Sequence, residues 1–257
     1  MKTSIFLTTL VIVASCVRAD GANSSPVRRL PFWHACQPTV VRTAVTAVEA
    51  TKQRLANVKA DSWKRGLTSD EREAMAEVFR ANAVDAVLQL QQSCKLATSG
   101  RFQAACKARE EEIASLALHD WRQAMPPDRL ESTKAVLVAK SIDLADTVLV
   151  ACGPATPGAF GAACKMHRQA LVAISQKDWQ RDRLSDEQDA VLQKVMMAYY
   201  VDASQSLTAS AGGAKVTLPP GDRPHIQALA VKIWSRDAAT ADETAALCRA
   251  LAASIGH

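Results

Sequence analysis

Aromatic side chains are scarce in this chain. Phe, Trp and Tyr together make up 5% of its 257 residues, and glycine and proline number only ten each. Strands are enriched in aromatic and β-branched residues, and the turns between them in glycine and proline, so this composition disfavours a β-rich fold. Apolar residues nevertheless reach 48%, and alanine supplies much of that fraction. The composition therefore predicts an all-α protein.

Catalytic and metal-binding signatures are also missing. The chain contains no H-E-x-x-H, G-x-S-x-G, H-x-E…C-x-x-C or G-x-x-x-x-G-K-[ST] pattern and no C-x2-C pair. Its net charge of +5 arises from mixed charges, without a basic block or interleaved aromatic and basic residues. This pattern argues against nucleic-acid binding. We therefore expect no cofactor, no metal centre and no nucleic-acid partner.

Only one long apolar run is present, and it lies near the N-terminus. Residues 1–19 combine a basic start, an apolar stretch over Ile5–Ala14 and a small residue at the end, which is typical of an export signal. The stretch is too short to span a membrane permanently. The V-A-S-C pattern ending at Cys16 also resembles a bacterial lipobox. We expect a secreted or periplasmic protein with a flexible lead over residues 20–35, or alternatively a lipoprotein anchored through Cys16.

One segment of the chain recurs after 58 residues. Cys94–Cys106 and Cys152–Cys164 both read C-x11-C, share Ala-Thr, Gly, Phe and Ala-Ala-Cys at matching places, and each precedes an Asp-Trp pair. Cys36 and Trp63 continue the step backwards, and Trp234 continues it forwards after a short deletion. Similarity at a fixed period is typical of tandem duplication. We therefore expect about four units, starting near residues 36, 94, 152 and 210.

Six cysteines remain beyond Cys16, which in an exported chain predicts three disulfides. The repeat favours two local pairs, Cys94–Cys106 and Cys152–Cys164. The third pair, Cys36–Cys248, then follows by elimination. These bonds would staple neighbouring helices and join the first helix to the last.

Apolar residues recur with a period of about 3.6 along most of the chain, and Ser/Thr-Asp-Glu starts such as Thr68–Glu71 precede several of the segments. This pattern predicts a helical hairpin for each unit. It predicts a single disulfide-stapled α-helical repeat domain over residues 36–257. We expect seven or eight helices, near residues 39–60, 69–93, 103–120, 128–150, 161–178, 185–209, 223–235 and 240–254.

Three aspartates recur inside the apolar helical segments. Asp85, Asp143 and Asp202 stand at matching places of successive units. A carboxylate within an apolar helix is disfavoured and needs a partner. We expect each aspartate to form an inter-helix salt bridge, with Arg109 or Arg168 as examples of the partner. The repeated tryptophans are expected to pack one helix of each hairpin onto the other, with Asp120 and Asp178 beside them as turn residues.

These observations favour an exported, non-enzymatic binding or inhibitor protein that presents a helical-repeat surface to a protein partner. Helical repeats commonly form extended binding faces, and this warrant rests on fold analogy. The enzyme class is left open. If the protein is an enzyme, its site is built from dispersed histidines and aspartates, and His167 and His225 are the best candidates because imidazole titrates near neutral pH.

A second alternative is a secreted carrier that binds a small apolar ligand between its helices. The densest group of large side chains is formed by Met196, Met197, Tyr199 and Tyr200. This group is core in the simplest interpretation, and a ligand pocket or partner-facing patch in the alternative.

Overall fold

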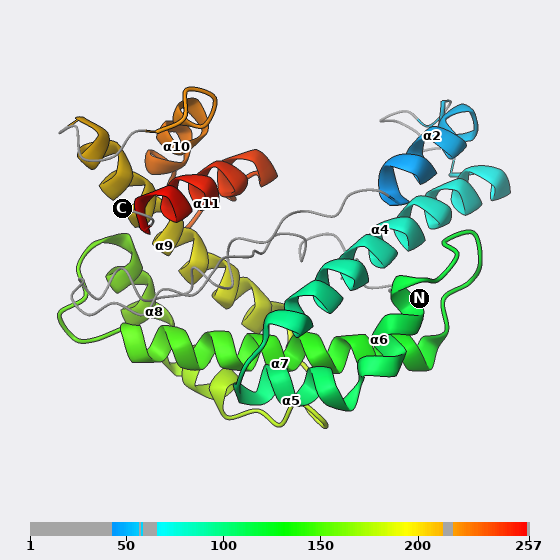
Figure 1. Ribbon diagram of the computed structural model, residues 1–257, viewed down its shortest axis with the longest axis horizontal. Coiled ribbons are helices and arrows are strands. Elements are labelled where there is room, and N and C mark those ends of the chain that lie inside the picture. Colours follow the sequence, from blue (N-terminus) through cyan, green and yellow to red (C-terminus); the bar gives the residue numbers. More distant parts are fainter. Residues whose placement is uncertain (1–42, 57, 59–65, 213–217, 256–257) are drawn as a thin grey trace. The chain divides into compact units, whose positions relative to one another are not determined.

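The computed structural model describes residues 43–56, 58, 66–212 and 218–255 of the chain. These residues form nine helices and no strand, so the prediction of an all-α chain is confirmed for them. The expected signal segment, the lead, Cys16, Cys36 and Trp63 lie outside the described residues. The helices are α2 (Thr43–Leu55), α4 (Ser69–Leu96), α5 (Gly100–Ala108), α6 (Glu110–Ala117), α7 (Pro127–Ala151), α8 (Gly158–Ser175), α9 (Asp186–Gly212), α10 (Arg223–Ala230) and α11 (Ala241–Ile255) (Figure 1).

The expected helix starts are confirmed where side chains cap the first turn. In Thr68–Glu71 the threonine oxygen accepts a bond from the glutamate amide at 3.2 Å, and the glutamate accepts the threonine amide at 2.8 Å. Thr240–Glu243 forms the same reciprocal pair at 3.2 and 2.8 Å. Ser185–Gln188 forms it with glutamine, at 3.2 and 3.1 Å. Each pair satisfies N–H groups that the helix itself leaves unbonded.

Several expected helices differ in their limits. The helix expected over residues 223–235 ends at Ala230, and the one expected over residues 39–60 ends at Leu55. The helix expected over residues 103–120 is broken at Arg109, whose φ of −128° and ψ of 23° separate α5 from α6. In addition, α5 and α8 both begin three residues earlier than expected, at Gly100 and Gly158. The reason lies in the bonds at those two helix starts, which are described below.

The chain divides into two compact units, which are described separately. The first contains residues 43–98 and 103–136 of the described chain, and the second contains residues 99–102 and 137–255. In the first unit α2 runs along α4 (Figure 1), and Ala47, Ala81, Val84 and Trp121 are buried together. No helix among the described residues is long and apolar enough to cross a membrane.

The second unit has two buried clusters. One lies where the C-terminal part of α7 packs with α8 and α9, and its members include Phe160, Leu171, Ile174 and Val195. The other lies where α9 meets α10 and α11, and includes Val201 and Leu247. Trp234, in the turn after α10, packs against both clusters.

Two of the expected disulfides are confirmed. Cys94 bonds to Cys106 with a Cα–Cα separation of 5.5 Å, and Cys152 bonds to Cys164 with a separation of 5.8 Å. Both separations are ordinary for a disulfide. The third expected pair, Cys36–Cys248, stays a prediction because Cys36 lies outside the described residues.

Candidate functional site

The three recurrent aspartates each bind the N-terminus of a neighbouring helix. In the first unit, Asp85 on α4 accepts bonds from the backbone amides of Thr43 at 3.1 Å and Ala44 at 2.9 Å, at the start of α2. The first four N–H groups of an α-helix have no acceptor within the helix and carry a partial positive charge. A carboxylate with two oxygens therefore satisfies two of them at once.

The second unit contains the same arrangement twice. Asp143 on α7 accepts the amides of Arg101 at 3.2 Å and Phe102 at 2.9 Å, at the start of α5. Asp202 on α9 accepts the amides of Ala159 at 3.0 Å and Phe160 at 2.9 Å, at the start of α8. In all three cases the aspartate lies 41 to 43 residues after the amides that it binds.

Glycine is required at the first residue of α5 and of α8. Gly100 and Gly158 have φ values of 88° and 78°, in the left-handed region that other residues rarely adopt. A Cβ atom at Gly100 would overlap Oδ2 of Asp143, and a Cβ atom at Gly158 would overlap Oδ2 of Asp202. The absence of a side chain thus lets each carboxylate approach the helix end.

The prediction that Arg109 and Arg168 form salt bridges with the recurrent aspartates is wrong. The Nη1 atom of Arg109 lies 3.4 Å from Glu112, and Nη1 of Arg168 donates to the carbonyl of Cys152 at 3.5 Å. Asp143 does have a cationic neighbour on another helix, because the guanidinium of Arg101 on α5 lies 3.9 Å from its carboxylate. Two adjacent backbone N–H groups can each bind one of the two carboxylate oxygens. Unlike an arginine, they require no long side chain to lose conformational freedom, and this favours them as partners of the aspartates.

A phenylalanine stands two residues after each of these glycines. Its ring contacts the residue that lies three positions before the capping aspartate. Tyr199 contacts Phe160 edge-on, with ring centroids 5.7 Å apart. At the equivalent place Lys140 holds its Nζ 5.6 Å from the ring centroid of Phe102. Burial lowers the pKa of the Lys140 amine to about 8 and raises the pKa of the Tyr199 hydroxyl to about 12. Tyr199 is buried in the core, and Lys140 is half-buried.

The repeated Asp-Trp pairs form turns, as expected. Asp120 accepts the amide of Arg122 and Asp178 accepts the amide of Gln180, each at 3.0 Å. Trp121 is buried in the first unit, and Trp179 is half-buried in the second. An Asp side chain bonded to the backbone two residues later stabilises such a turn.

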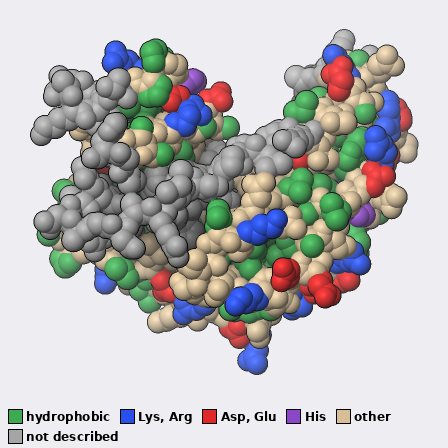
Figure 2. Space-filling model, in the orientation of Figure 1, with side chains coloured by type: hydrophobic (Ala, Val, Ile, Leu, Met, Phe, Trp, Pro, Cys, Tyr) green, Lys and Arg blue, Asp and Glu red, His purple; other side chains and the backbone are tan. Residues whose placement is uncertain are grey.

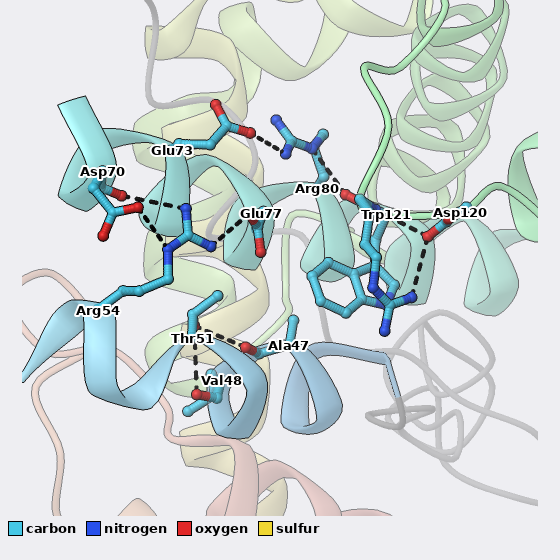
Figure 3. A network of polar contacts seen from close by, with 11 residues as sticks. Ala47, Val48, Thr51, Arg54, Asp70, Glu73, Glu77, Arg80, Asp120 and Trp121 are labelled. Atoms are coloured by element: carbon cyan, nitrogen blue, oxygen red, sulfur yellow. Dashed lines mark hydrogen bonds and ion pairs between the residues drawn. The ribbon is translucent and has the colours of Figure 1, made fainter.

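A polar network fastens the Trp121 turn to α4 in the first unit (Figure 3). Arg80 donates to the carbonyl of Trp121 at 2.8 Å and to Glu73 at 2.6 Å. The guanidinium of Arg122 stacks over the Trp121 ring, 4.3 Å from its centroid. The stacked cation and the carbonyl bond fix the ring from two sides.

A separate set of ion pairs ties α2 to α4. Arg54 on α2 donates to Asp70 at 2.9 Å and to Glu77 at 2.7 Å (Figure 3). Thr51 is fully buried and bonds to the carbonyl of Ala47 within its own helix. These polar groups therefore have partners within the first unit.

The two candidate catalytic histidines lie apart from an acid–base partner. The Nε2 atom of His167, on α8, is buried without a hydrogen-bond partner, and burial and the charge of Lys194 lower its pKa. His225 is half-buried near the start of α10. The nearby carboxylate of Asp222 instead binds Arg249, with a shortest distance of 2.5 Å. General acid–base catalysis needs a titrating atom within reach of substrate, and the buried Nε2 of His167 does not meet that requirement.

The Met196–Tyr200 cluster lies in the interior. Met196, Met197 and Tyr199 are only 7%, 4% and 4% exposed, and Tyr200 is partly buried. These side chains belong to the two cores of the second unit, so they do not form the partner-facing patch of the alternative interpretation. These large side chains are buried because α9 packs with α8 on one side and with α10 and α11 on another.

The exposed apolar side chains of the first unit were missed from the sequence. Val45, Val48 and Phe79 are 61%, 49% and 48% exposed. Val48 directly follows the buried Ala47, and Phe79 directly follows the partly buried Val78. A single sequence holds no signal that separates such neighbours, since a wide apolar stripe has two edges and only the fold decides which is covered.

The described residues contain no group of three or more His, Cys, Asp or Glu side chains that could hold a metal ion. Comparison of the chain with protein-family models, with curated proteins and with solved structures finds no match.

Proposed function

We propose that the protein is an exported, non-enzymatic binding module that presents helix faces to a protein partner. The observation that carries this proposal is the exposure of Val45, Val48 and Phe79 on the paired helices α2 and α4. Large apolar side chains gathered on helices are typical of protein interaction sites, although singly exposed ones are common.

The bonds that the three recurrent aspartates form support the same proposal. Asp85, Asp143 and Asp202 each bond to two backbone amides of a helix end. A carboxylate occupied in this way stabilises the scaffold and is poorly placed for general acid–base work. The most distinctive polar residues of the sequence therefore belong to the framework, and function is left to the surface.

We further propose that the chain is a tandem of one helical hairpin, with about four units of 58 residues. Three matched features support this duplication: the aspartates that each cap a helix start 41 to 43 residues earlier, the Asp-Trp turns, and the ends of α6, α8 and α10. At those ends Leu118, Gln176 and Val231 each donate their N–H to the carbonyl two residues earlier, and each stands three residues before a tryptophan.

Export is the third part of the proposal. Two disulfides that staple consecutive helices are consistent with an oxidising compartment. The apolar stretch over Ile5–Ala14 supports an export signal, and the lipidation of Cys16 remains the alternative fate of the mature N-terminus.

The proposed docking surface is the apolar group Val45, Val48 and Phe79. Val45 and Val48 are three residues apart on α2, so they lie next to each other on its solvent face. Phe79 lies on α4, where Met75 and Ala86 are half-buried on the same side by helical period. Figure 2 shows hydrophobic side chains reaching the surface over α4. A partner with a complementary apolar face would bury all three.

Charge substitution within this surface tests the proposal. We expect the double variant Val48→Asp/Phe79→Asp to fold normally and to lose partner capture from culture of the source organism by about tenfold or more. The measurement is affinity capture of cross-linked partners, quantified by mass spectrometry, with circular dichroism and melting temperature confirming the fold.

Val150→Asp is the matched control, because Val150 is 87% exposed on α7 in the second unit. It should capture the same partner as the wild type. Equal capture by the wild type and the double variant would refute the docking surface. Loss of an enzymatic turnover in His167→Ala or His225→Ala, with folding intact, would refute the non-enzymatic proposal itself.

A further inference from the structure

His167, on α8, lies where the turn between α10 and α11 approaches this helix. Its ring meets the ring of Trp234 edge-to-face, with centroids 6.2 Å apart and an interplanar angle of 88°. Trp234, Leu251 and Ala252 are half-buried against the core that α8 and α9 build. The contact of His167 with Trp234 is thus part of the surface by which the segment after α9 rests on α8.

The side chain of His167 is half-buried, and its surroundings disfavour a charge on the buried ring nitrogen. Its Nε2 atom is buried and has no hydrogen-bond partner. A buried polar atom without a partner is costly, and a buried cation without a counter-ion is costlier still. Protonation of Nε2 would therefore create an unpaired charge at the contact with Trp234.

The charged group of α9 that acts on His167 is Lys194, which carries the same sign as an imidazolium. Within α8, Arg168 donates to the carbonyl of Cys152. The described carboxylates of the C-terminal segment interact with other groups: Glu243 binds Lys232, Asp222 binds Arg249, Asp237 accepts the amide of Ile233, and Asp242 acts on Arg249.

We propose that His167 makes the packing of the turn between α10 and α11 on α8 sensitive to pH, so that acidification loosens this contact. The proposal does not depend on the identity of any partner. It makes the C-terminal segment the part of the second unit that responds first to a mildly acidic medium.

The direction of the effect follows from linkage. The pKa of His167 in the folded chain lies below its ordinary value of 6.5, because of burial first and of Lys194 second. Between those two values the unfolded chain binds more protons than the folded one, so stability falls as pH falls through that window. The stabilisation is fully present above the unfolded value and is lost below the folded one.

Hydrogen exchange of the full-length protein measures this response locally. We expect the protection factors of amides in α10 and α11, corrected for the intrinsic pH dependence of exchange, to fall by about threefold or more between about pH 7.5 and about pH 5. Amides at the centre of α4, in the other unit, should show no comparable fall. The imidazole of His167, followed by NMR, should titrate below its ordinary value.

His167→Phe is the informative variant, because it keeps an aromatic ring against Trp234 and removes the titrating group. It should abolish the acid-induced loss of protection in α10 and α11. His167→Met serves the same purpose if the phenylalanine variant does not fold, and His119→Phe, in the other unit, should leave the response unchanged. An unchanged response in the His167 variants, or titration of His167 at or above its ordinary value, would overturn the proposal.

Discussion

Replacing Asp143 with alanine is expected to lower the free energy of unfolding by about 2–3 kcal/mol. The substitution removes both oxygens that accept the amides of Arg101 and Phe102, and it leaves two N–H groups at the start of α5 without an acceptor. Hydrogen bonds to a charged group contribute more than neutral ones, and the carboxyl is only 19% exposed. Chemical denaturation with urea, monitored by circular dichroism, measures the change.

Asp146→Ala is the matched control for this variant. Asp146 lies one turn further along α7 and binds the guanidinium of Arg101, in a pair whose two side chains are 44% and 43% exposed. Exposed pairs of this kind contribute little, so the control should lose less than about 1 kcal/mol. Equal losses in the two variants would show that Asp143 acts as an ordinary surface charge and not as the cap of α5.

Replacing Gly158 with alanine is expected to destabilise the protein by about 3 kcal/mol or more. The backbone conformation alone costs an L-residue about 1 kcal/mol, because φ is 78°. The new Cβ would also overlap Oδ2 of Asp202 and push it away from the amides of Ala159 and Phe160. The loss of those bonds adds about 2 kcal/mol.

Gly66→Ala isolates the backbone contribution. Gly66 has a similar φ of 75°, and no atom lies within 4 Å of its added Cβ. It should therefore cost only about 1 kcal/mol. In an Asp202→Ala background, Gly158→Ala should also cost about that much, because the carboxylate with which it collides is gone. Additive losses of Gly158→Ala and Asp202→Ala would contradict the proposed collision.

The sequence predicted most helices well because their starts carry local chemistry. Reciprocal capping in Thr68–Glu71 and Thr240–Glu243 involves residues three apart, so the pattern is visible in one dimension. The disulfides Cys94–Cys106 and Cys152–Cys164 were predictable for a related reason. Their cysteines recur at the same spacing, and each pair closes a short loop.

The starts of α5 and α8 were placed too late because their caps come from far along the chain. Asp143 and Asp202 lie more than 40 residues from the amides they bind. A sequence shows that a carboxylate within an apolar helix needs a partner, and it does not show that the partner is a backbone group. The glycines at 100 and 158 therefore looked like loop residues, whereas each is the first residue of a helix.

The surface was the least predictable part of the molecule. Helical periodicity cannot tell which edge of an apolar stripe is covered, and Phe79 lies at an edge that the fold leaves half open. For Met196 and Tyr199 the simplest interpretation, a place in the core, agrees with the structure, and the alternative of a partner-facing patch does not. Both are buried because α9 has packed neighbours on more than one side.

The central claim is that the three recurrent aspartates do the same structural work in successive hairpins. Hydrogen exchange of the wild-type protein at the amides of Ala44, Phe102 and Phe160 tests it most directly. First-turn amides without an acceptor exchange rapidly, as is expected for Asp186 and Glu187 at the start of α9. We predict that the three aspartate-bonded amides are protected by about tenfold or more relative to those two. Exchange of all three at the rate of Asp186 and Glu187 would contradict the account.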